Sequence, residues 1–461
     1  MPAAVPDPSA ASSLPPPNQA AANERPDCDI FCVVVDNFGD IGVCWRLARQ
    51  LAADRGWRVR LWVDDLRVFA RLCPALDVQA PRQTVDGIAI ARWQRTDEAA
   101  AAMGREMDLE MGREMGREMG REMGLETPAA IIIEAFGCDL PESYLNAMAR
   151  RDRRPVWINL EYLSAEAWVA EFHLQPSPHP RLALLKTFFF PGLTPGTGGV
   201  LRERWLSEAR RDFLAMLGQG GLLKPDLSSP ESLIADASTP TSSTPTSPVS
   251  GPSPLWPALG MVAPPRDATL ISLFGYENPA LPALLSAWRD GAEAIVCVVP
   301  EGRMSQGVAH FLGLPAFNAG AGARVGRLTL HAVPFMDSAL YDRLLWACDL
   351  NFVRGEDSFV RAQWAERPLV WHIYPQAEAA HLPKLDAALA CYGAGLPASA
   401  REAQAAFWHA WNAGDPTLLD WPGFWRHRAA LLTRAGVWAE ELARLGDLAG
   451  NLAEFAENQL K

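Results

Sequence analysis

The fold class of this chain is decided by one stretch near its start, Ile30-Phe31-Cys32-Val33-Val34-Val35-Asp36-Asn37-Phe38-Gly39-Asp40-Ile41-Gly42. The apolar run at its beginning is typical of a buried strand in a parallel sheet, and residues 43–55 predict the helix that follows. An acidic turn with glycines separates the two. Ligands of open α/β sheets bind outside the carboxyl ends of the strands, so we expect this turn to border a binding site.

Two carboxylates stand four residues apart in this turn, Asp36 and Asp40. A pair of acids at such a place can orient a cationic acceptor and take a proton from it. Either aspartate can instead cap the helix, because its side chain accepts hydrogen bonds from free N–H groups of the first turn. Gly39 and Gly42 do not have the G-x-G-x-x-G spacing of a dinucleotide-binding turn. The residues alone leave both interpretations of the aspartates open.

Strand-like apolar runs alternate with helix-like segments along the rest of the chain. They predict strands at residues 57–63, 129–134, 156–160, 269–274, 294–299, 328–333, 350–353 and 369–373. The alternation continues on both sides of a Ser/Thr/Pro-rich stretch, which predicts an α/β protein with two Rossmann-like domains of parallel sheet. A cleft between two such domains is a natural site for a small molecule.

The domain organisation that we expect from the composition has five parts. These are a disordered tail (1–26), an N-terminal Rossmann-like domain (27–218), a disordered insertion or linker (219–265), a C-terminal Rossmann-like domain (266–435) and a C-terminal helix (436–461) that packs back on the N-terminal domain. A Met-Gly-Arg-Glu repeat at residues 103–124 interrupts the N-terminal domain. We interpret the repeat as an exposed loop or frayed helix, because its glycines weaken a helix.

The composition excludes several function classes. The 461 residues carry a formal charge of −12, which argues against general affinity for nucleic acid. The eight cysteines form no C-x-x-C pair and the eight histidines form no H-E-x-x-H motif, so we expect no metal site. Without a secretory signal or a run long enough to span a bilayer, we expect a cytoplasmic protein that does not enter the membrane.

A second motif follows the strand predicted at 350–353 and reads Arg354-Gly355-Glu356-Asp357-Ser358. The glycine allows a tight turn and the acids open a helix, whose free N–H groups make an anion site suited to a diphosphate. Ser358 can donate to a phosphate oxygen. An ordinary helix N-cap with acids in the first turn explains the same residues.

Aromatic residues also follow strands of the second half. Tyr276 lies in the turn 274–278 and Phe335 in the turn 334–337, where a base or sugar can stack on them. Either ring can instead simply close the core. A glycine-rich loop at 188–202, which contains Phe190, lines the cleft or is structural.

Four of these stretches resemble the protein-arginine rhamnosyltransferases of bacterial elongation factor P, the EarP family. They are residues 34–43, 158–164 (Ile-Asn-Leu-Glu-Tyr-Leu-Ser), 189–199 and 352–358. The similarity covers roughly residues 28–218 and 267 to the C-terminus. The tail, the repeat that interrupts the first of these ranges and the Ser/Thr/Pro-rich stretch fall outside it.

The resemblance implies a GT-B glycosyltransferase, with two Rossmann-like domains that face each other across a cleft. Such an enzyme transfers L-rhamnose, with inversion, from dTDP-β-L-rhamnose to one arginine of elongation factor P, which activates that factor for the rescue of ribosomes stalled at polyproline. The implied partners are the donor and the folded acceptor protein, without a cofactor, a metal, nucleic acid or a membrane.

The resemblance also assigns roles to residues. Catalysis is assigned to Asp36, Asp40 and Glu356. The expected substrate-binding residues are Tyr276, Phe335, Arg354, Asp357 and Ser358 for the nucleotide side, together with Asn37, Phe38, Gly39 and Phe190. Where family members often carry a glutamine near the thymine, this chain has Asp337-Ser338, which puts that base contact in doubt.

The chemistry of the acceptor fits these residues. A guanidinium stays protonated in proteins and is a poor nucleophile. Carboxylates can grip it, turn one nitrogen toward the anomeric carbon and accept a proton as the new bond forms. We expect Asp36 to be the base, Asp40 to orient the acceptor or the turn, and Glu356 to position the sugar or stabilise positive charge at the anomeric centre.

Two alternatives remain at the level of the sequence. One is a GT-B enzyme with another nucleotide-sugar or a small-molecule acceptor. The other is a binding protein on the same scaffold that holds the nucleotide-sugar without turnover.

Overall fold

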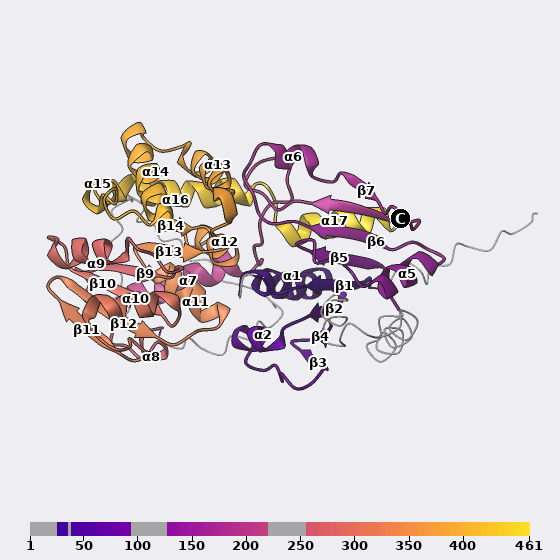
Figure 1. The fold of residues 1–461 in the computed structure, drawn as a ribbon, viewed down its shortest axis with the longest axis horizontal. Coiled ribbons are helices and arrows are strands. Elements are labelled where there is room, and N and C mark those ends of the chain that lie inside the picture. The colour runs from indigo at the N-terminus through magenta and orange to yellow at the C-terminus, as the bar shows by residue number, and fades with distance from the viewer. Residues whose placement is uncertain (1–24, 36–37, 94–126, 220–254) are drawn as a thin grey trace, which may run out of the picture.

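The computed structural model describes residues 25–35, 38–93, 127–219 and 255–461, which form two sheet-centred halves side by side (Figure 1). Each half is a mostly parallel sheet with helices on its faces. Strands such as β5 (Ile131–Ala135) are buried along their whole length, so both faces of the sheet have to be covered. The tail 1–24, the repeat at 103–124 and residues 220–254 lie outside the described residues, and the expectations for them remain predictions.

The N-terminal half is built on an eight-stranded sheet in the order β3-β4-β2-β1-β5-β6-β8-β7. Its other strands are β1 (Asp27–Cys32), β2 (Arg58–Val63), β3 (Arg82–Val85), β4 (Ile88–Arg92), β6 (Val156–Leu160), β7 (Pro176–Pro178) and β8 (Leu185–Phe189). Only β3 and β7, at the two edges of this sheet, pair antiparallel with their neighbours. The helices of this half are α1 (Gly39–Arg55), α2 (Leu66–Leu72), α5 (Glu142–Arg150) and α6 (Trp168–Phe172).

The first strand differs from its prediction in an informative way. It was expected at residues 30–35 but spans Asp27–Cys32, and Val35 is largely exposed in the turn. The extra residues include Asp29, which is fully buried and accepts hydrogen bonds from Arg60 and from the indole N–H of Trp62. A polar residue in a strand core breaks the apolar pattern, and its partners, which also include the backbone N–H of Ala129 and the hydroxyl of Tyr144, make it tolerable.

The C-terminal half is built on a six-stranded sheet in the order β11-β12-β10-β9-β13-β14. Its strands are β9 (Thr269–Leu273), β10 (Ile295–Pro300), β11 (Gly322–Val325), β12 (Leu328–Val333), β13 (Leu350–Arg354) and β14 (Leu369–His372). Its helices are α9 (Leu281–Asp290), α10 (Arg303–Leu312), α11 (Ser338–Ala347) and α12 (Asp357–Gln363). The strands predicted in this half are present. β11 and the strands β3, β4, β7 and β8 of the other sheet were not predicted.

Two helices between the sheets depart from the expected organisation. Helix α7 (Leu206–Gln219) packs on the C-terminal half, where the ring of Phe213 lies 5.6 Å from that of Trp346. Helix α8 (Leu255–Ala258) lies inside the stretch 219–265 that was expected to be disordered. Leu255 and Trp256 are buried there, and this apolar burial orders a segment whose neighbours in sequence are Ser, Thr and Pro. The domain boundaries themselves stay predictions.

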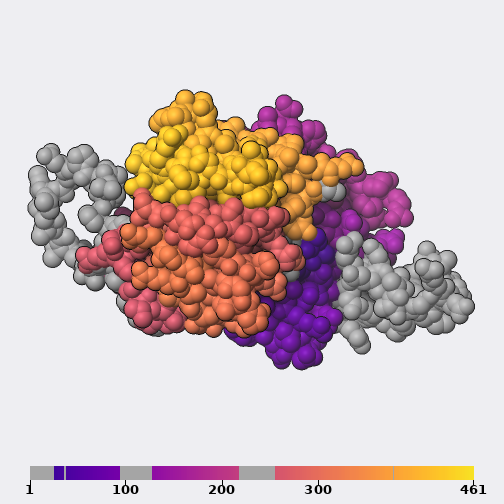
Figure 2. Space-filling view, turned by 60° about the vertical axis from the view of Figure 1, so that its left-hand side comes forward, coloured from indigo at the N-terminus to yellow at the C-terminus, as the bar shows by residue number. Residues whose placement is uncertain are grey.

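The C-terminal helices join the halves. They are α13 (Leu382–Gly393), α14 (Ala398–Ala413), α15 (Trp421–Trp425), α16 (Arg428–Ala443) and α17 (Leu448–Gln459). α17 lies in the N-terminal half beside α1 (Figure 1). The helices α13 to α16 cover the C-terminal half, as the orange and yellow atoms of the space-filling view show (Figure 2). The indole of Trp438 in α16 donates to Gln363 of α12 at 2.5 Å.

The glycine-rich loop contacts α17, and it also packs closely on its own half. Asn451 donates to the carbonyl of Gly198 at 3.0 Å, and Leu448 N–H donates to the carbonyl of Val200 at 3.1 Å. A Cβ on Gly198 would lie 2.4 Å from the ring of Phe189. The glycine-rich loop at 188–202 therefore contacts the C-terminal helix, which supports the structural interpretation of that loop.

Two further expectations concern cysteines and membranes. Seven of the eight cysteines are buried and none is in a disulfide within the described residues. Among the helices that the structure describes, none combines the length and the apolarity that a bilayer crossing needs.

We predict that Leu452→Ala lowers the free energy of unfolding by about 2–5 kcal/mol, because Leu452 of α17 is fully buried against the N-terminal half and its truncation leaves a cavity. Urea denaturation followed by circular dichroism measures the change. Glu454→Ala on the exposed face of the same helix is the control and is expected to stay within about 0.5 kcal/mol of wild type. Equal effects of both changes would contradict the packing role.

Candidate active site

The acidic turn and the Arg354–Ser358 motif meet at a cavity of about 170 Å³ between the two halves, which we call the acceptor-side cavity after the acceptor that the family resemblance predicts there. The turns after β6 and β13, the start of α1 and residues near α13 surround it. The lining residues that the argument uses are Gly39, Asp40, Phe136, Tyr162, Glu356 and Lys384. Both sheets contribute the carboxyl ends of their strands here, which is where ligands of open α/β sheets bind.

Asp40 is buried at the start of α1, but it does not cap the helix in the expected way. The residue at the N-cap is Phe38, and no side chain caps this end. One oxygen of Asp40 accepts from the backbone N–H of Val35 at 2.7 Å, and the other accepts from the hydroxyl of Tyr162 at 3.1 Å. Asp40 therefore fastens the acidic turn to the strand before it and to the loop after β6.

Tyr162 was quoted within the motif 158–164 but was not assigned a role. Its ring stacks on Phe136, with centroids 4.3 Å apart, and its exposed fraction is 37%. Burial of the hydroxyl and the neighbouring Asp40 raise the pKa of Tyr162 well above its usual range. The phenol therefore stays protonated and donates a hydrogen bond to Asp40. The Nζ of Lys384 lies 5.8 Å from the ring centroid, so this ring already faces a cation.

Glu356 reaches the same cavity from the C-terminal half. It occupies the N-cap position of α12 without capping it, because its Oε2 accepts instead from the backbone N–H of Leu163 at 2.9 Å. Removal from water raises the pKa of Glu356 to about 8, while the Leu163 N–H and Lys384 oppose this shift and Asp40 adds to it. The expected alternative of an ordinary acidic N-cap does not hold for this residue.

Beside this cavity lie two adjoining hollows of about 70 and 760 Å³, which we call the donor cavity. They share Phe38, Phe274, Pro300, Phe335 and Arg354. Phe274, Pro300 and Arg354 lie at the carboxyl ends of β9, β10 and β13, and Phe335 follows β12. The larger hollow falls within the size range of small-molecule sites.

Arg354 and the aromatic rings form the walls of this donor cavity. The Arg354 guanidinium lies 4.7 Å from the ring centroid of Phe274 and 4.8 Å from that of Tyr276. Phe335 packs against Phe38 of the other half at 4.8 Å. These are cation–π and ring contacts, and the guanidinium of Arg71 also lies 5.0 Å from the ring centroid of Phe335.

Ser358 and Asp357 both line the smaller hollow, and both already have partners. The Ser358 hydroxyl accepts from the Arg354 N–H at 2.9 Å and donates to the Arg354 carbonyl. Asp357 is paired with Arg46 and Arg361. The donation from Ser358 to a phosphate oxygen that the sequence suggested is directed to the backbone in this structure.

The structure thus brings together most of the predicted residues that it describes. Gly39, Asp40 and Glu356 line the acceptor-side cavity, and Phe38, Phe335, Arg354, Asp357 and Ser358 line the donor cavity. Tyr276 is buried beside Arg354. Phe190 lies apart, with its ring 5.5 Å from Trp168, and Asp36 and Asn37 lie outside the described residues.

Asp337, the departure from the family pattern, has a local explanation. Its carboxylate accepts from the N–H of Leu340 at 2.8 Å and caps α11. No local pattern in the sequence pointed to Lys384 or Phe136, which reach the site from segments without a recognisable motif.

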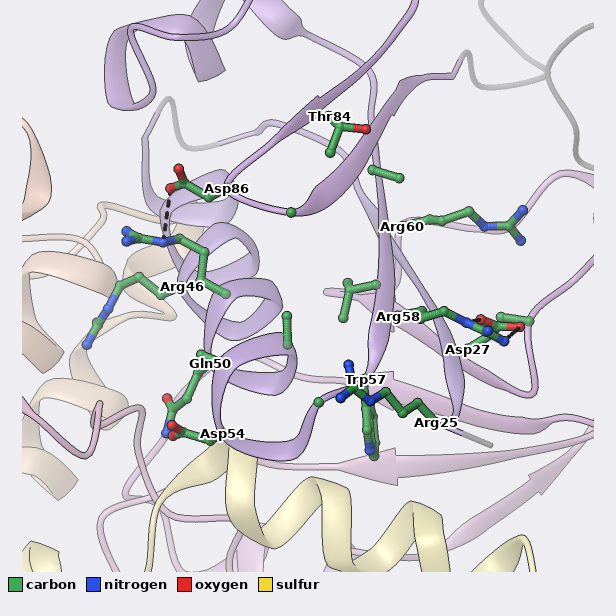
Figure 3. Close-up of a pocket in the computed structure, with 18 of the residues that line it drawn as sticks. Arg25, Asp27, Arg46, Gln50, Asp54, Trp57, Arg58, Arg60, Thr84 and Asp86 are labelled. Carbon is green, nitrogen blue, oxygen red and sulfur yellow. Dashed lines mark hydrogen bonds and ion pairs between the residues drawn. The ribbon is translucent and has the colours of Figure 1, made fainter. Parts of the chain in front are cut away.

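A larger hollow, about 1040 Å³, lies elsewhere among the described residues (Figure 3). It is at the amino ends of β1 and β2, opposite to the ends where α/β sheets bind ligands. Its arginines are largely neutralised: Arg49 pairs with Asp86, Arg58 with Asp27, and Arg60 with Asp29. We therefore place the active site at the smaller cavities between the halves.

Comparison with known proteins decides the family. The profile described as "Elongation-Factor P (EF-P) rhamnosyltransferase EarP" matches residues 28–457. The chain belongs to this family. A protein-arginine rhamnosyltransferase of Pseudomonas aeruginosa is 43% identical over 427 residues, which cover 93% of this chain and 98% of the relative. One of Pseudomonas putida is 40% identical over 442 residues, or 94% and 99% of the two chains.

A solved structure supports the same grouping. It describes EarP-mediated arginine glycosylation of translation elongation factor EF-P and superimposes with a TM-score of 0.58 at 29% identity, covering 94% of this chain and 99% of that one. Together with the two sheets, this likeness confirms the predicted fold class, an α/β protein of GT-B type with two Rossmann-like domains.

We predict that Glu356→Gln stabilises the protein relative to wild type increasingly as the pH rises from about 5 to about 8. The raised pKa means that folded Glu356 keeps its proton in this range while the unfolded chain, with a pKa of 4.5, has released it. The unfolded state therefore binds fewer protons, and the stability of wild type falls with pH, whereas glutamine does not titrate. Urea denaturation of both proteins across this range measures the difference, and a constant difference would contradict the raised pKa.

Proposed function

We propose that this protein transfers L-rhamnose, with inversion, from dTDP-β-L-rhamnose to an arginine side chain of elongation factor P. Membership in the EarP family over residues 28–457 supports the reaction and the acceptor protein. The observation that carries the proposal is the meeting of two acids from opposite halves, Asp40 and Glu356, in one cavity beside a larger one with aromatic walls.

The acceptor-side cavity suits a guanidinium. Asp40 and Glu356 supply carboxyl oxygens, and Tyr162 supplies an aromatic face that already lies near a cation, Lys384. A planar cation gains from both kinds of neighbour, through charge-assisted hydrogen bonds and stacking on the ring. A neutral sugar hydroxyl as acceptor would use neither.

The surroundings of Asp40 support a division of roles between the two aspartates. Both oxygens of Asp40 already accept hydrogen bonds, from Val35 N–H and from Tyr162, so Asp40 holds the turn in place. The proton of the acceptor nitrogen then goes to Asp36, which the family resemblance also assigns to catalysis. As the nitrogen attacks the anomeric carbon, the bond to the dTDP oxygen breaks on the opposite face, which is a single inverting displacement.

The donor cavity meets the needs of the leaving group. Arg354 lines both hollows of this cavity, where its positive charge can stabilise the departing diphosphate. Phe274 and Phe335 line this cavity and supply aromatic surface for the base or sugar. The diphosphate is itself the leaving group, so the proposed reaction uses no cofactor. Its acceptor is a translation factor, which places the reaction in the cytoplasm.

We predict that purified protein adds one deoxyhexose to elongation factor P in the presence of dTDP-β-L-rhamnose, and that Asp36→Asn abolishes this gain because the base is lost. Intact-mass spectrometry of the acceptor measures both. Asp152→Asn, a change of the same chemistry on the exposed surface, is the control and should leave the gain intact. No gain with folded wild type that binds dTDP would overturn the acceptor assignment.

We predict that Tyr162→Phe lowers kcat about tenfold or more and leaves the KM for the donor unchanged. The change removes a hydrogen bond to the charged Asp40, a type of bond worth about 1.5–3 kcal/mol, and a loss of about 1.4 kcal/mol is tenfold in rate. Tyr374→Phe removes a hydroxyl from the same cavity without touching Asp40 and serves as the control. Initial rates with varied donor separate the two constants; wild-type kcat would contradict the role of Tyr162.

A further inference from the structure

A chain of buried ion pairs connects the two halves next to the donor cavity. It begins at Arg46 in α1, whose side chain is 3% exposed. The Nε and Nη2 of Arg46 donate to the two carboxylate oxygens of Glu203 at 2.9 and 3.0 Å. Its Nη1 donates to Oδ1 of Asp357 in the C-terminal half at 3.0 Å. One guanidinium therefore holds an acid from each half.

The chain of ion pairs continues within the C-terminal half. The second oxygen of Asp357 accepts from Nε of Arg361 at 3.1 Å. Arg361 in turn donates to both oxygens of Asp342 in α11, at 2.9 and 2.8 Å. Asp357 thus has one oxygen on each arginine, and its position depends on both.

The backbone of α1 also approaches Asp357 closely, which is independent of the charges. A Cβ on Gly42 would lie 3.1 Å from Oδ2 of Asp357. Only a glycine one turn before Arg46 leaves the carboxylate this room. Helix α1 therefore determines the place of Asp357 twice, through the arginine and through the missing side chain.

The buried ion pairs require an arginine at position 46 and not only a positive charge. Burial acts to raise the pKa of Glu203, but the Arg46 guanidinium outweighs it and the pKa lies at about 2. A buried carboxylate held ionised in this way requires its cation, because the loss of one partner leaves an unpaired charge away from water. The fork of a guanidinium serves two acids at once, which the single ammonium of lysine cannot do in the same geometry.

The position of Asp357 matters for the donor cavity. Asp357 and Arg361 both line its smaller hollow, with Ser358 and Arg354 beside them. Arg46 is not among the described residues that line either hollow of this cavity. Arg46 is among the residues that line the hollow of about 1040 Å³, and in Figure 3 its side chain points from α1 away from Thr84 and Arg60.

We propose that Arg46 is a positioning residue: it holds Asp357 and thereby couples the N-terminal half to donor binding in the C-terminal half. The proposal rests on the proposed function for the identity of the donor. The affinity for the nucleotide then depends on a side chain of the other half that does not line its cavity.

The first test is calorimetric titration of dTDP into the full chain and its Arg46→Lys variant. We expect the Kd for dTDP to rise tenfold or more, because lysine keeps the charge but cannot hold Glu203 and Asp357 together. Arg49→Lys is the matched control: Arg49 is on the same helix and is half exposed beside Asp86. In steady state the KM for the donor is expected to rise while the KM for elongation factor P stays unchanged.

A second variant keeps the test independent of the arginine. Gly42→Ala adds one methyl group against Asp357 and favours the helix, so it is expected to fold and to weaken dTDP binding in the same direction. Wild-type affinity for dTDP in both Arg46→Lys and Gly42→Ala would overturn the proposal.

A third measurement separates this proposal from the proposed function. Hydrogen exchange of the α12 amides, without any ligand, is expected to speed up in Arg46→Lys and not in Arg49→Lys. If wild type does not bind dTDP, the donor assignment fails while the exchange result still decides the role of Arg46. Unchanged exchange in Arg46→Lys would show that Asp357 does not depend on Arg46.

Discussion

One loop after β6 holds both of the acids at the centre of the proposed site. Tyr162 donates from its side chain to Asp40, and the next residue, Leu163, donates from its backbone to Glu356. Because the two acids come from different halves, this loop sets their distance and orientation at the same time. Carboxylates that approach each other away from water repel, so the geometry persists only where donors such as these are supplied. The site therefore depends on the way the two sheets are held together.

The contacts between the halves lie around this point. Arg46 reaches Asp357, the indole of Trp364 donates to the carbonyl of Leu201, and α17 returns to α1. The first two of these contacts are an ion pair and a hydrogen bond, whereas α17 packs through buried apolar residues such as Leu452. An interface of this kind is specific in geometry, since hydrogen bonds and ion pairs are directional where apolar burial is not.

The sequence predicted the parts of this arrangement that follow from local rules. An acidic turn after a buried strand and a glycine turn after another had to lie at carboxyl ends of sheets, and the structure brings Asp40 and Glu356 into one cavity. Partners far apart in the chain could not be predicted: Arg46 and Asp357 are 311 positions apart, and Tyr162 and Asp40 are 122 apart. The edge strands β3, β7 and β11 were missed because they are short and half exposed, so they lack a continuous apolar run.

The charges of the proposed acceptor-side cavity favour a positively charged acceptor over a neutral one. The raised pKa of Glu356 keeps this acid neutral at pH 7, because burial and the charge of Asp40 both disfavour a second carboxylate. A guanidinium between the two acids offsets their mutual repulsion. Its positive charge lowers the pKa of Glu356 and stabilises both carboxylates together. A neutral acceptor supplies no such charge and would leave Glu356 protonated. The paired acids thus favour a cation over a hydroxyl before any contact with the rest of the acceptor protein, which remains to select one arginine among many.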